Sequence, residues 1–355
     1  MILLAGVGSR LDPLTRDTPK PLAPVLGKPV VQHIVSLCKE HGYINFAANT
    51  HVLAHKIHEH FKNAQEKFGI SLNMVHEENL TGIAGGIRSC RKFLTQDVIL
   101  IIMGDALTDL DLSYLYDRHI KSNCAVTVGI MEVEDTSQYG VVVTDKNDRI
   151  ISFQEKPKPH EAKSNLANTA IYFFNQNILK EIPTEHEAPM YDVATDLFSK
   201  LMKKNIPMQG ININAYWADI GTRKQYKQSI KDTLEGKVKI KINASKTSFG
   251  FKEEGVYIDP QAKIEGKVYL GRNVKIQKGA VITGPVYIEK DCTIEENSIV
   301  EDSIIWSWSR IAKDSKLINS MLGNNCHLKD GIVTNSVWGP GSIITKSLKP
   351  EFVLS

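Results

Sequence analysis

Glycine and basic residues near the start of the chain form a pattern that could bind phosphate. An apolar run at residues 2–4 leads into a glycine turn, and a lysine follows between two prolines. Glycines let backbone N–H groups approach a phosphate closely, while an arginine and a lysine supply charge for a polyphosphate. The segment has neither a Walker A loop nor the third glycine of a dinucleotide fingerprint, so its glycines alone are weak evidence. The candidate nucleotide-binding residues of this segment are Ala5, Gly6, Gly8, Ser9, Arg10 and Lys20.

Two aspartates could supply the ligands of a magnesium ion. Asp105 follows the apolar run Val98–Met103, at the carboxyl end of a predicted central strand, where open α/β sheets place their ligand crevice. Asp219 lies further on, within residues 217–221 of sequence Trp-Ala-Asp-Ile-Gly. A single aspartate at such a position often only caps the following turn. Two carboxylates together offer the oxygen ligands that magnesium prefers, so the pair predicts a magnesium site.

The complete N-terminal phrase is far more specific than its glycines. Residues 6–15 are Gly-Val-Gly-Ser-Arg-Leu-Asp-Pro-Leu-Thr, and with the Pro-Lys-Pro of residues 19–21 they closely resemble the signature of the sugar-1-phosphate nucleotidyltransferases. Further blocks typical of that family follow along essentially the whole chain: Thr81–Gly86, Gly104–Asp105, Tyr139–Gly140, Phe153–Pro157, Asn168 with Tyr172, and Trp217–Thr222. The resemblance implies an α/β fold in which a Rossmann-like (GT-A-like) mixed-sheet nucleotidyltransferase domain is followed by a left-handed parallel β-helix of hexapeptide repeats.

The resemblance also implies roles for individual residues. Asp105 and Asp219 would hold Mg²⁺, and the catalytic set would be Arg10, Lys20, Asp105, Lys156 and Asp219. Gly82 and Gly85 would allow backbone contact with the nucleobase, with Glu77 or Glu78 contributing, although these glycines would also suit a plain strand-to-helix turn. The residues that would bind the sugar phosphate are Gly140, Glu155, Lys156 and Asn168.

Two positions depart from the family pattern. Ala5 stands where the family usually has the first glycine of a pair, and the first strand is about two residues shorter than expected, which bears on the tightness of the phosphate loop or on the start of the chain. Asn168–Thr169–Ala170 replaces the commoner Asn-Ala-Gly, so we expect a slightly altered sugar pocket.

Under this interpretation an oxygen of the sugar 1-phosphate attacks the α-phosphorus of a nucleoside triphosphate and expels pyrophosphate. Such a displacement needs positioning and charge neutralisation more than a protein nucleophile. Arg10 and Lys20 would stabilise the departing pyrophosphate, Lys156 would orient the nucleophile, and magnesium would neutralise charge on the phosphates.

The substrates are less constrained than the reaction. Lys20 within Pro-Lys-Pro, without an arginine-rich block nearby, disfavours the glucose-1-phosphate adenylyltransferase branch. The segments Ile83–Ile87 and Gly104–Leu112 resemble mannose-1-phosphate guanylyltransferases and a cyanobacterial type of UTP–glucose-1-phosphate uridylyltransferase. We predict GTP with mannose 1-phosphate, and keep UTP or dTTP with glucose 1-phosphate as alternatives.

Residues 1–235 alternate short apolar runs with amphipathic stretches, which indicates a mostly parallel sheet covered by helices. The clearest expected strands are Val98–Met103, Ala125–Met131, Gly140–Thr144, Ile150–Phe153 and Ala170–Phe174. Expected helices include Pro29–Glu40 and Tyr226–Leu234.

A six-residue repeat begins at Val256. An apolar or small residue recurs every six positions up to Ile304, and a second series runs two places later from Ile258 to Trp306. Such a short period is typical of a stacked β-solenoid, which we expect over residues 255–345 after a linker at 236–254. We expect the period to drift beyond Ser309, with Ile311 and Leu317 in a shifted phase, and Gly339–Gly341 to form a cap.

Composition excludes several classes of protein. The net charge of +3 offers no bulk basic field for nucleic acid or an anionic membrane. No run approaches the about 20 apolar residues of a membrane span, and residues 1–10 lack the regions of a signal peptide. Five cysteines without a CxxC motif support neither a zinc site nor a disulfide framework. We expect a cytoplasmic enzyme that binds neither nucleic acid nor membrane.

There are two alternatives to this interpretation, and one expectation about assembly. A solenoid acyltransferase would need a general base, and His327 is the only histidine after Gly236. A catalytically silent subunit that binds nucleotide sugars would have little reason to keep all five catalytic charges. The exposed ends of a solenoid favour partner contacts, so we expect a homo-oligomer formed through the β-helix.

Overall fold

The computed structural model describes residues 1–346 and 352–354. They form two compact units. The first unit contains Met1–Val7, Val35–Gly104 and Thr108–Trp217, and the second contains Gly8–Ile34, Asp105–Leu107 and the chain from Ala218 onward. Each unit is therefore assembled from segments that are far apart in the sequence.

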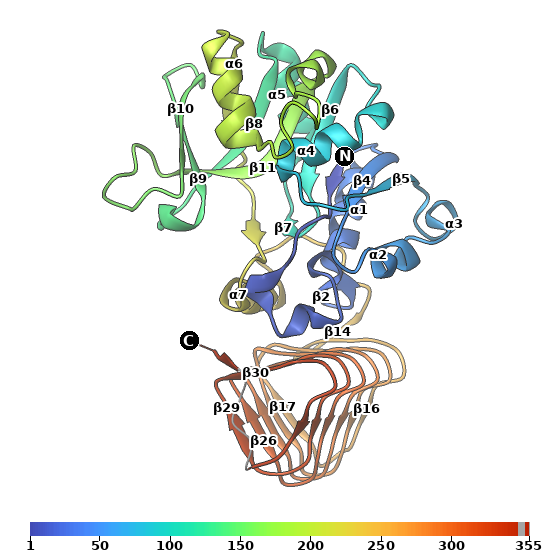
Figure 1. Cartoon of the computed structure of the whole chain (residues 1–355). Coiled ribbons are helices and arrows are strands. Elements are labelled where there is room, and N and C mark those ends of the chain that lie inside the picture. Colours follow the sequence, from blue (N-terminus) through green and yellow to red (C-terminus); the bar gives the residue numbers. More distant parts are fainter. Residues whose placement is uncertain (347–351, 355) are drawn as a thin grey trace. The chain divides into compact units, whose positions relative to one another are not determined.

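A nine-stranded mixed sheet forms the centre of the first unit (Figure 1). Its main path runs β10-β9-β11-β6-β1-β4-β5, and β8 pairs with both β11 and β12. The strands are β1 (Ile2–Leu3), β4 (Asn45–Thr50), β5 (Ser71–His76), β6 (Val98–Met103), β8 (Val126–Glu132), β9 (Gly140–Thr144), β10 (Ile150–Glu155), β11 (Leu166–Asn175) and β12 (Met208–Asn212).

The mixed sheet that the family resemblance implies is confirmed, but the expectation of a mostly parallel sheet is wrong. β1 pairs in parallel with β4 and β6, whereas β11 pairs antiparallel with β6, β8 and β9. Each expected strand exists, and β11 is longer than predicted because it continues past a register shift between Asn168 and Tyr172. A long bulged strand of this kind gives no simple alternating pattern in the sequence.

Short helices accompany this sheet: α2 (Ala54–His60), α3 (Ala64–Phe68), α4 (Gly82–Ser89), α5 (Leu112–Lys121) and α6 (Ser199–Lys203), with α1 (Val30–Glu40) contributing its second half. α5 begins at the N-cap residue Asp111, whose Oδ1 accepts a hydrogen bond of 2.8 Å from the Tyr114 N–H. Buried apolar residues of β6, β8 and β11, including Ile101, Val128 and Phe174, belong to one core cluster with α4. This core holds the strand ends that carry the candidate site residues.

Three sheets of short strands form a parallel β-helix in the second unit. One sheet contains β14 (Ser245–Thr247), β15 (Gly250–Lys252), β18 (Val268–Leu270), β21 (Val286–Ile288), β24 (Ile304–Ile305), β27 (Met321–Leu322), β30 (Ser336–Trp338) and β32 (Phe352–Val353). The second contains β16 (Tyr257–Ile258), β19 (Lys275–Ile276), β22 (Thr293–Ile294), β25 (Arg310–Ile311), β28 (His327–Leu328) and β31 (Ile343–Ile344). The third contains β17 (Lys263–Glu265), β20 (Val281–Thr283), β23 (Ile299–Glu301), β26 (Lys316–Ile318) and β29 (Ile332–Thr334).

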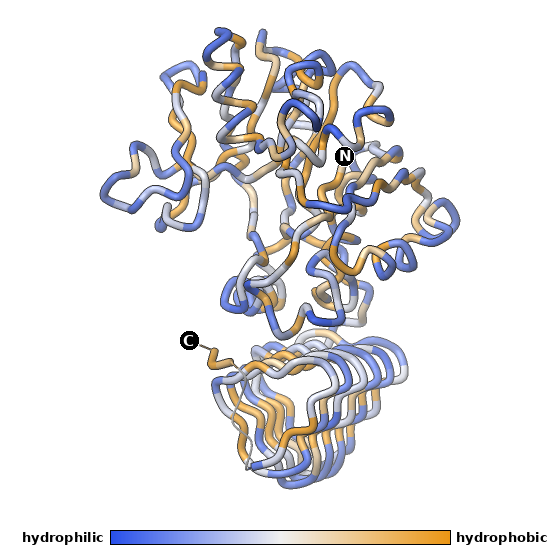
Figure 2. The backbone as a smooth tube through the Cα atoms, viewed as in Figure 1, coloured by the Kyte–Doolittle hydropathy of each residue, from blue (hydrophilic) through white to orange (hydrophobic). Residues whose placement is uncertain are grey.

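Apolar residues recur at the same places on successive coils, as Figure 2 shows. The coils shorten along the stack: partners are 18 residues apart at Val268 and Val286, 17 at Ile304 and Met321, and 16 at Met321 and Val337. The predicted drift is real, but it begins before Ser309. Ile305 takes the place in the inner core that the six-residue period assigns to Trp306. A turn that loses one residue moves the next side chain to the other face of its strand, so Trp306 leaves the inner core.

Two further expectations change at the ends of the β-helix. β14 and β15 lie within residues 236–254, so this segment takes part in a sheet rather than being only a connection. Gly339–Gly341 is a corner rather than a cap, because β31 follows it and β32 then pairs antiparallel with β30. No helix among the described residues is both long and apolar enough to cross a membrane.

The second unit also contains the hairpin of β2 (Pro24–Val25) with β3 (Lys28–Pro29) and the helix α7 (Arg223–Leu234). α7 is three residues longer at its start than the pattern predicted, because Thr222 accepts the Gln225 N–H at 3.2 Å and caps the helix. These elements flank the candidate site residues of this unit.

Candidate active site

The side chain of Lys20 lies between two carboxylates. Its Nζ is 2.6 Å from Asp105 Oδ2 and 2.9 Å from Asp219 Oδ1, and the lysine side chain is only 7% exposed. Burial disfavours the ammonium, but the charges and hydrogen bonds of the two aspartates outweigh it and raise the pKa of Lys20 above its ordinary value. Lys20 is therefore a permanent cation at this point.

Pairing of two short strands brings the aspartates together. β7 (Ala106–Thr108) pairs with β13 (Trp217–Asp219), and the Ile220 N–H donates to the Asp105 carbonyl oxygen at 3.3 Å. Gly221 leaves room for the side chains around it, because a Cβ atom there would lie 2.6 Å from Asp219 Oδ2 and 2.9 Å from an Arg10 nitrogen. The sequence Asp-Ile-Gly thus places the carboxylate and keeps the space beside it open.

The glycine turn predicted for phosphate binding packs against Lys20. Gly8 has a φ of +71°, which favours glycine, and a Cβ atom there would lie 3.1 Å from the Lys20 Cβ. The Gly8 carbonyl oxygen accepts hydrogen bonds from the Leu11 N–H and the Thr15 hydroxyl, both at 3.0 Å. This turn leads into the short 3₁₀ helix Ser9–Leu11 beside the Cβ atom of Lys20.

Arg10 supplies a second cation near Asp219. Its Nη2 lies 3.7 Å from Asp219 Oδ2, and its side chain is 55% exposed. Ser9 is exposed as well. Of the predicted catalytic set, Arg10, Lys20, Asp105 and Asp219 thus lie together in the second unit.

The other predicted phosphate-loop residues belong to the first unit. Ala5 is buried and Gly6 is exposed, directly after the Leu4 N–H, which donates to Asn49 Oδ1 at 3.1 Å. At the end of the short first strand, the Asn49 side chain therefore takes the place of a backbone hydrogen bond from a neighbouring strand.

A buried carboxylate lies beside the predicted nucleobase segment. Glu77, which is 6% exposed, accepts the Asn49 amide at 2.7 Å and the Thr81 hydroxyl at 3.1 Å. Gly82 and Gly85 lie in the first turn of α4, and a Cβ atom on the next residue, Gly86, would lie 3.0 Å from Glu77 Oε1. Glu78 is exposed. Glu77, rather than Glu78, is therefore the carboxylate held at this segment.

Three of the predicted sugar-binding residues lie together on neighbouring strands of the first unit. Gly140 pairs with Glu155 across β9 and β10, and a Cβ atom on Gly140 would lie 3.2 Å from Glu155 Oε2 and 3.8 Å from the Asn168 Cβ. Lys156 follows Glu155, and its Nζ lies 3.2 Å from Glu155 Oε1. Asn168 is oriented from the other side, because its amide donates to the Tyr172 hydroxyl at 3.0 Å.

The departure at Ala170 has a structural consequence. Ala170 adopts a φ of +55°, a conformation that usually belongs to glycine, within the bulge of β11. Its N–H donates to Asn168 Oδ1 at 2.9 Å, so this conformation helps to orient the Asn168 side chain.

Sequence reasoning missed several residues that hold these groups in place. Asn49 orients Glu77, Arg223 Nη1 donates to the Asp12 carbonyl oxygen at 2.8 Å, and Tyr226 contacts Pro24. None of them lies in a family-like block, Tyr226 belongs to a pattern that predicts only a helix, and each acts through a neighbour that is distant in the sequence. The sequence carries no signal that could have found them.

Comparisons with known proteins agree with the resemblance. Residues 1–236 match the family described as nucleotidyl transferase, and residues 251–353 match the GMPPB C-terminal domain. The UTP–glucose-1-phosphate uridylyltransferase of Synechocystis sp. is 34% identical in an alignment 353 residues long that covers 93% of this chain and 89% of that protein. The chain belongs to the sugar-1-phosphate nucleotidyltransferase family. The fold and the enzyme class predicted from the sequence are thereby confirmed.

Other relatives of this nucleotidyltransferase carry different substrate names. The mannose-1-phosphate guanylyltransferase of Mycobacterium tuberculosis is 27% identical over 280 residues, which are 79% of this chain and 76% of that protein. A solved structure of a candidate glucose-1-phosphate thymidylyltransferase from Bacillus anthracis is 26% identical, with a TM-score of 0.58 over 65% of this chain and 92% of that one. These relatives agree on the reaction class and differ in nucleotide and sugar.

Replacing Ala170 by glycine should stabilise this nucleotidyltransferase. Relief of the left-handed strain, about 1–2 kcal/mol, exceeds the extra backbone entropy that glycine loses, about 0.5–1 kcal/mol. We expect Ala170→Gly to raise the free energy of unfolding by about 0.5–1 kcal/mol in urea denaturation. Ala170→Val, which adds a β-branch at the same φ, should lower it. Unchanged or lower stability of the glycine variant would contradict the assigned backbone conformation.

Proposed function

We propose that this enzyme transfers the guanylyl group of GTP to mannose 1-phosphate and releases pyrophosphate. The observation that carries the choice of GTP is the buried carboxylate of Glu77 beside α4. An ionised carboxylate can only accept hydrogen bonds, and each oxygen has two lone pairs. Asn49 uses one lone pair on Oε1 and Thr81 uses one on Oε2, so both oxygens can accept once more. Guanine offers two adjacent N–H donors, at N1 and N2, whereas uracil offers a single N–H between two carbonyl groups.

The cofactor we propose is Mg²⁺, held by Asp105 and Asp219. The two carboxylates fit the ion in chemistry, because one oxygen of each already lies within 2.9 Å of a single cation, the Lys20 ammonium. When bound, magnesium would neutralise charge on the phosphates. No group of three acidic, histidine or cysteine ligands occurs among residues 1–346 and 352–354, so phosphate oxygens and water would complete the coordination.

The chain's own residues then divide the work of the displacement. Lys20 and Arg10 stabilise the negative charge of the departing pyrophosphate, and the turn at Gly6 and Gly8 presents backbone N–H groups to the triphosphate. Glu155 accepts hydrogen bonds from sugar hydroxyl groups, and Asn168 accepts such bonds or donates them. Lys156 orients the phosphate that attacks. No covalent intermediate on the protein is required.

A second candidate has support of its own. The uridylyltransferase of Synechocystis sp. is 34% identical to this chain, above the 27% of the mycobacterial guanylyltransferase, which favours UTP with glucose 1-phosphate. The catalytically silent alternative is not retained, because the chain keeps the charged residues and belongs to a family of enzymes.

We also propose a homo-oligomer formed through the β-helix, where Tyr257, Ile332 and Ile343 are exposed apolar residues. A monodisperse monomer in sedimentation equilibrium would refute that part.

Pyrophosphate release by the purified protein with magnesium should identify the substrates. GTP, UTP, dTTP, ATP and CTP are each combined with mannose, glucose and N-acetylglucosamine 1-phosphate, and we expect the highest rate for GTP with mannose 1-phosphate. Asp105→Ala should lower that rate by about 100-fold or more, since it removes a metal ligand. A highest rate for UTP with glucose 1-phosphate would favour the second candidate, and no activity in any combination would refute both.

Exchanging the carboxylate at the nucleobase segment should change nucleotide preference. Glu77→Gln presents one donor and one acceptor in place of two acceptors, so we expect kcat/KM for GTP to fall by about 10- to 100-fold relative to UTP. Glu78→Gln makes the same chemical change at the exposed neighbouring residue and should leave the preference unaltered. If both variants keep the wild-type ratio while remaining folded by circular dichroism, Glu77 does not select the base.

A further inference from the structure

Tyr226 of α7 links the β-helix to the segment that carries Lys20. Its hydroxyl group lies 2.6 Å from the Pro24 carbonyl oxygen and 3.0 Å from the Trp306 indole nitrogen. The Tyr226 and Trp306 rings meet edge to face with centroids 6.1 Å apart, and both side chains are fully buried. Tyr226 therefore cannot touch a substrate, and any effect it has on the reaction must pass through its neighbours.

Trp306 determines the direction of these hydrogen bonds. An indole N–H can only donate, so the Tyr226 oxygen accepts from Trp306 and must direct its own hydrogen to the Pro24 carbonyl oxygen. Burial raises the pKa of Tyr226 well above its ordinary value, so the hydroxyl keeps this hydrogen. Trp306 lies outside the inner core because its coil is shorter than a regular one. The irregular coil therefore supplies the indole N–H donor.

The segment between Pro24 and Lys20 is short and tightly turned. The Ala23 N–H donates to the Lys20 carbonyl oxygen at 3.0 Å, and the Leu22 N–H donates to the Pro19 carbonyl oxygen at 2.7 Å. Prolines at positions 19, 21 and 24 fix three of the backbone φ angles. Fixing the position of the Pro24 carbonyl group therefore restricts the position of the Lys20 Cα atom, from which the side chain extends.

The same helix also follows the second aspartate directly. α7 begins at Arg223, four residues after Asp219, and Thr222 caps it. Arg223 donates to the Asp12 carbonyl oxygen, two residues beyond Arg10. α7 is thus connected to the chain on both sides of the Lys20 and Asp219 ion pair.

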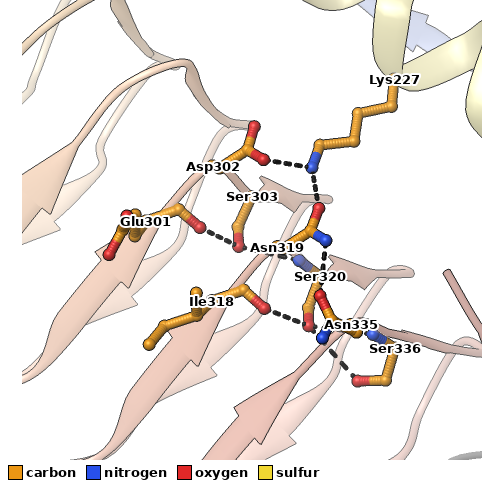
Figure 3. Close-up of polar contacts among 9 residues, drawn as sticks. All are labelled: Lys227, Glu301, Asp302, Ser303, Ile318, Asn319, Ser320, Asn335 and Ser336. Carbon is orange, nitrogen blue, oxygen red and sulfur yellow. Dashed lines mark hydrogen bonds and ion pairs between the residues drawn. The ribbon is translucent and has the colours of Figure 1, made fainter. Parts of the chain in front are cut away.

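A second contact attaches α7 to the β-helix next to Tyr226. Figure 3 shows Lys227 Nζ between the side chains of Asp302 and Asn319, with the Asp302 oxygen 2.7 Å away. Asn319 donates in turn to Asn335 of the next coil at 2.5 Å. Beside them the Ser320 N–H donates to Ser303 Oγ at 3.1 Å. Hydrogen bonds therefore connect the successive coils that α7 contacts, and they restrict the movement of these coils relative to one another.

We propose that Tyr226 is a positioning residue for the transfer reaction. Through Pro24 and through the start of α7 it holds the Lys20 ammonium and the Asp219 carboxylate at their mutual distance, and Trp306 of the β-helix directs its hydroxyl group. The β-helix thereby helps to position the charged groups of the catalytic centre. This inference rests on the proposed transferase function, which names the reaction that the two charges serve.

Removing the hydroxyl group tests the proposal. We expect Tyr226→Phe to lower kcat for the preferred substrate pair by about tenfold while both KM values stay within about twofold, because binding groups are unchanged and only their alignment is lost. Trp306→Phe should show the same pattern with a smaller loss. Hydrogen–deuterium exchange should become faster in peptides covering residues 19–27 of both variants, and stay unchanged in peptides covering residues 268–301.

Trp338→Phe is the matched control. The Trp338 N–H donates to Ser336 Oγ at 2.9 Å inside the β-helix, so this variant loses a buried indole hydrogen bond that has no link to Pro24. It should keep wild-type kcat and wild-type exchange at residues 19–27. The proposal is overturned if folded Tyr226→Phe and Trp306→Phe keep wild-type kcat and exchange, or if Trp338→Phe loses as much kcat as they do. If the wild-type protein turns over no substrate pair, the proposed function fails and the exchange comparison alone decides whether Tyr226 holds the loop.

Discussion

The ammonium of Lys20 between Asp105 and Asp219 is the contact on which the arrangement of the second unit depends. Two carboxylates this close repel each other unless a cation lies between them, and here the cation is nearly buried. Loss of one partner from a buried ion pair typically costs about 3–5 kcal/mol, because the remaining charges keep their desolvation penalty. The contact joins residues 20, 105 and 219, so it can form only after three distant segments have come together.

The β-helix contributes to this contact through packing rather than chemistry. Its coils shorten from 18 to 16 residues, and the change of phase moves Trp306 out of the inner core toward α7. A perfectly regular stack would have placed Trp306 inside the β-helix, where its indole N–H could not reach Tyr226. The irregularity in the repeat is thus tied to the helix that follows Asp219.

Much of the fold follows from local patterns in the sequence. Val98–Met103 is a strand at its predicted bounds because six apolar residues with β-branching, bounded by polar turns, suit a buried central strand. The bulge at Ala170 and the position of Trp306 could not be predicted in this way, since two extra residues in β11 and a turn one residue shorter in the β-helix interrupt the regular patterns. The family-like phrases identified Lys20, Asp105 and Asp219, whereas Asn49 and Tyr226 act through contacts across the sequence that no local pattern encodes.

The magnesium dependence of turnover tests the central assignment most directly. Asp219→Asn keeps the size of the side chain but weakens it as a metal ligand, so the magnesium concentration for half-maximal pyrophosphate release should rise by about tenfold or more. Lys20→Met should lower the maximal rate without raising that concentration, because the role we propose for Lys20 is to stabilise phosphate charge and not to bind the metal. An Asp219→Asn enzyme with wild-type magnesium dependence would contradict the account.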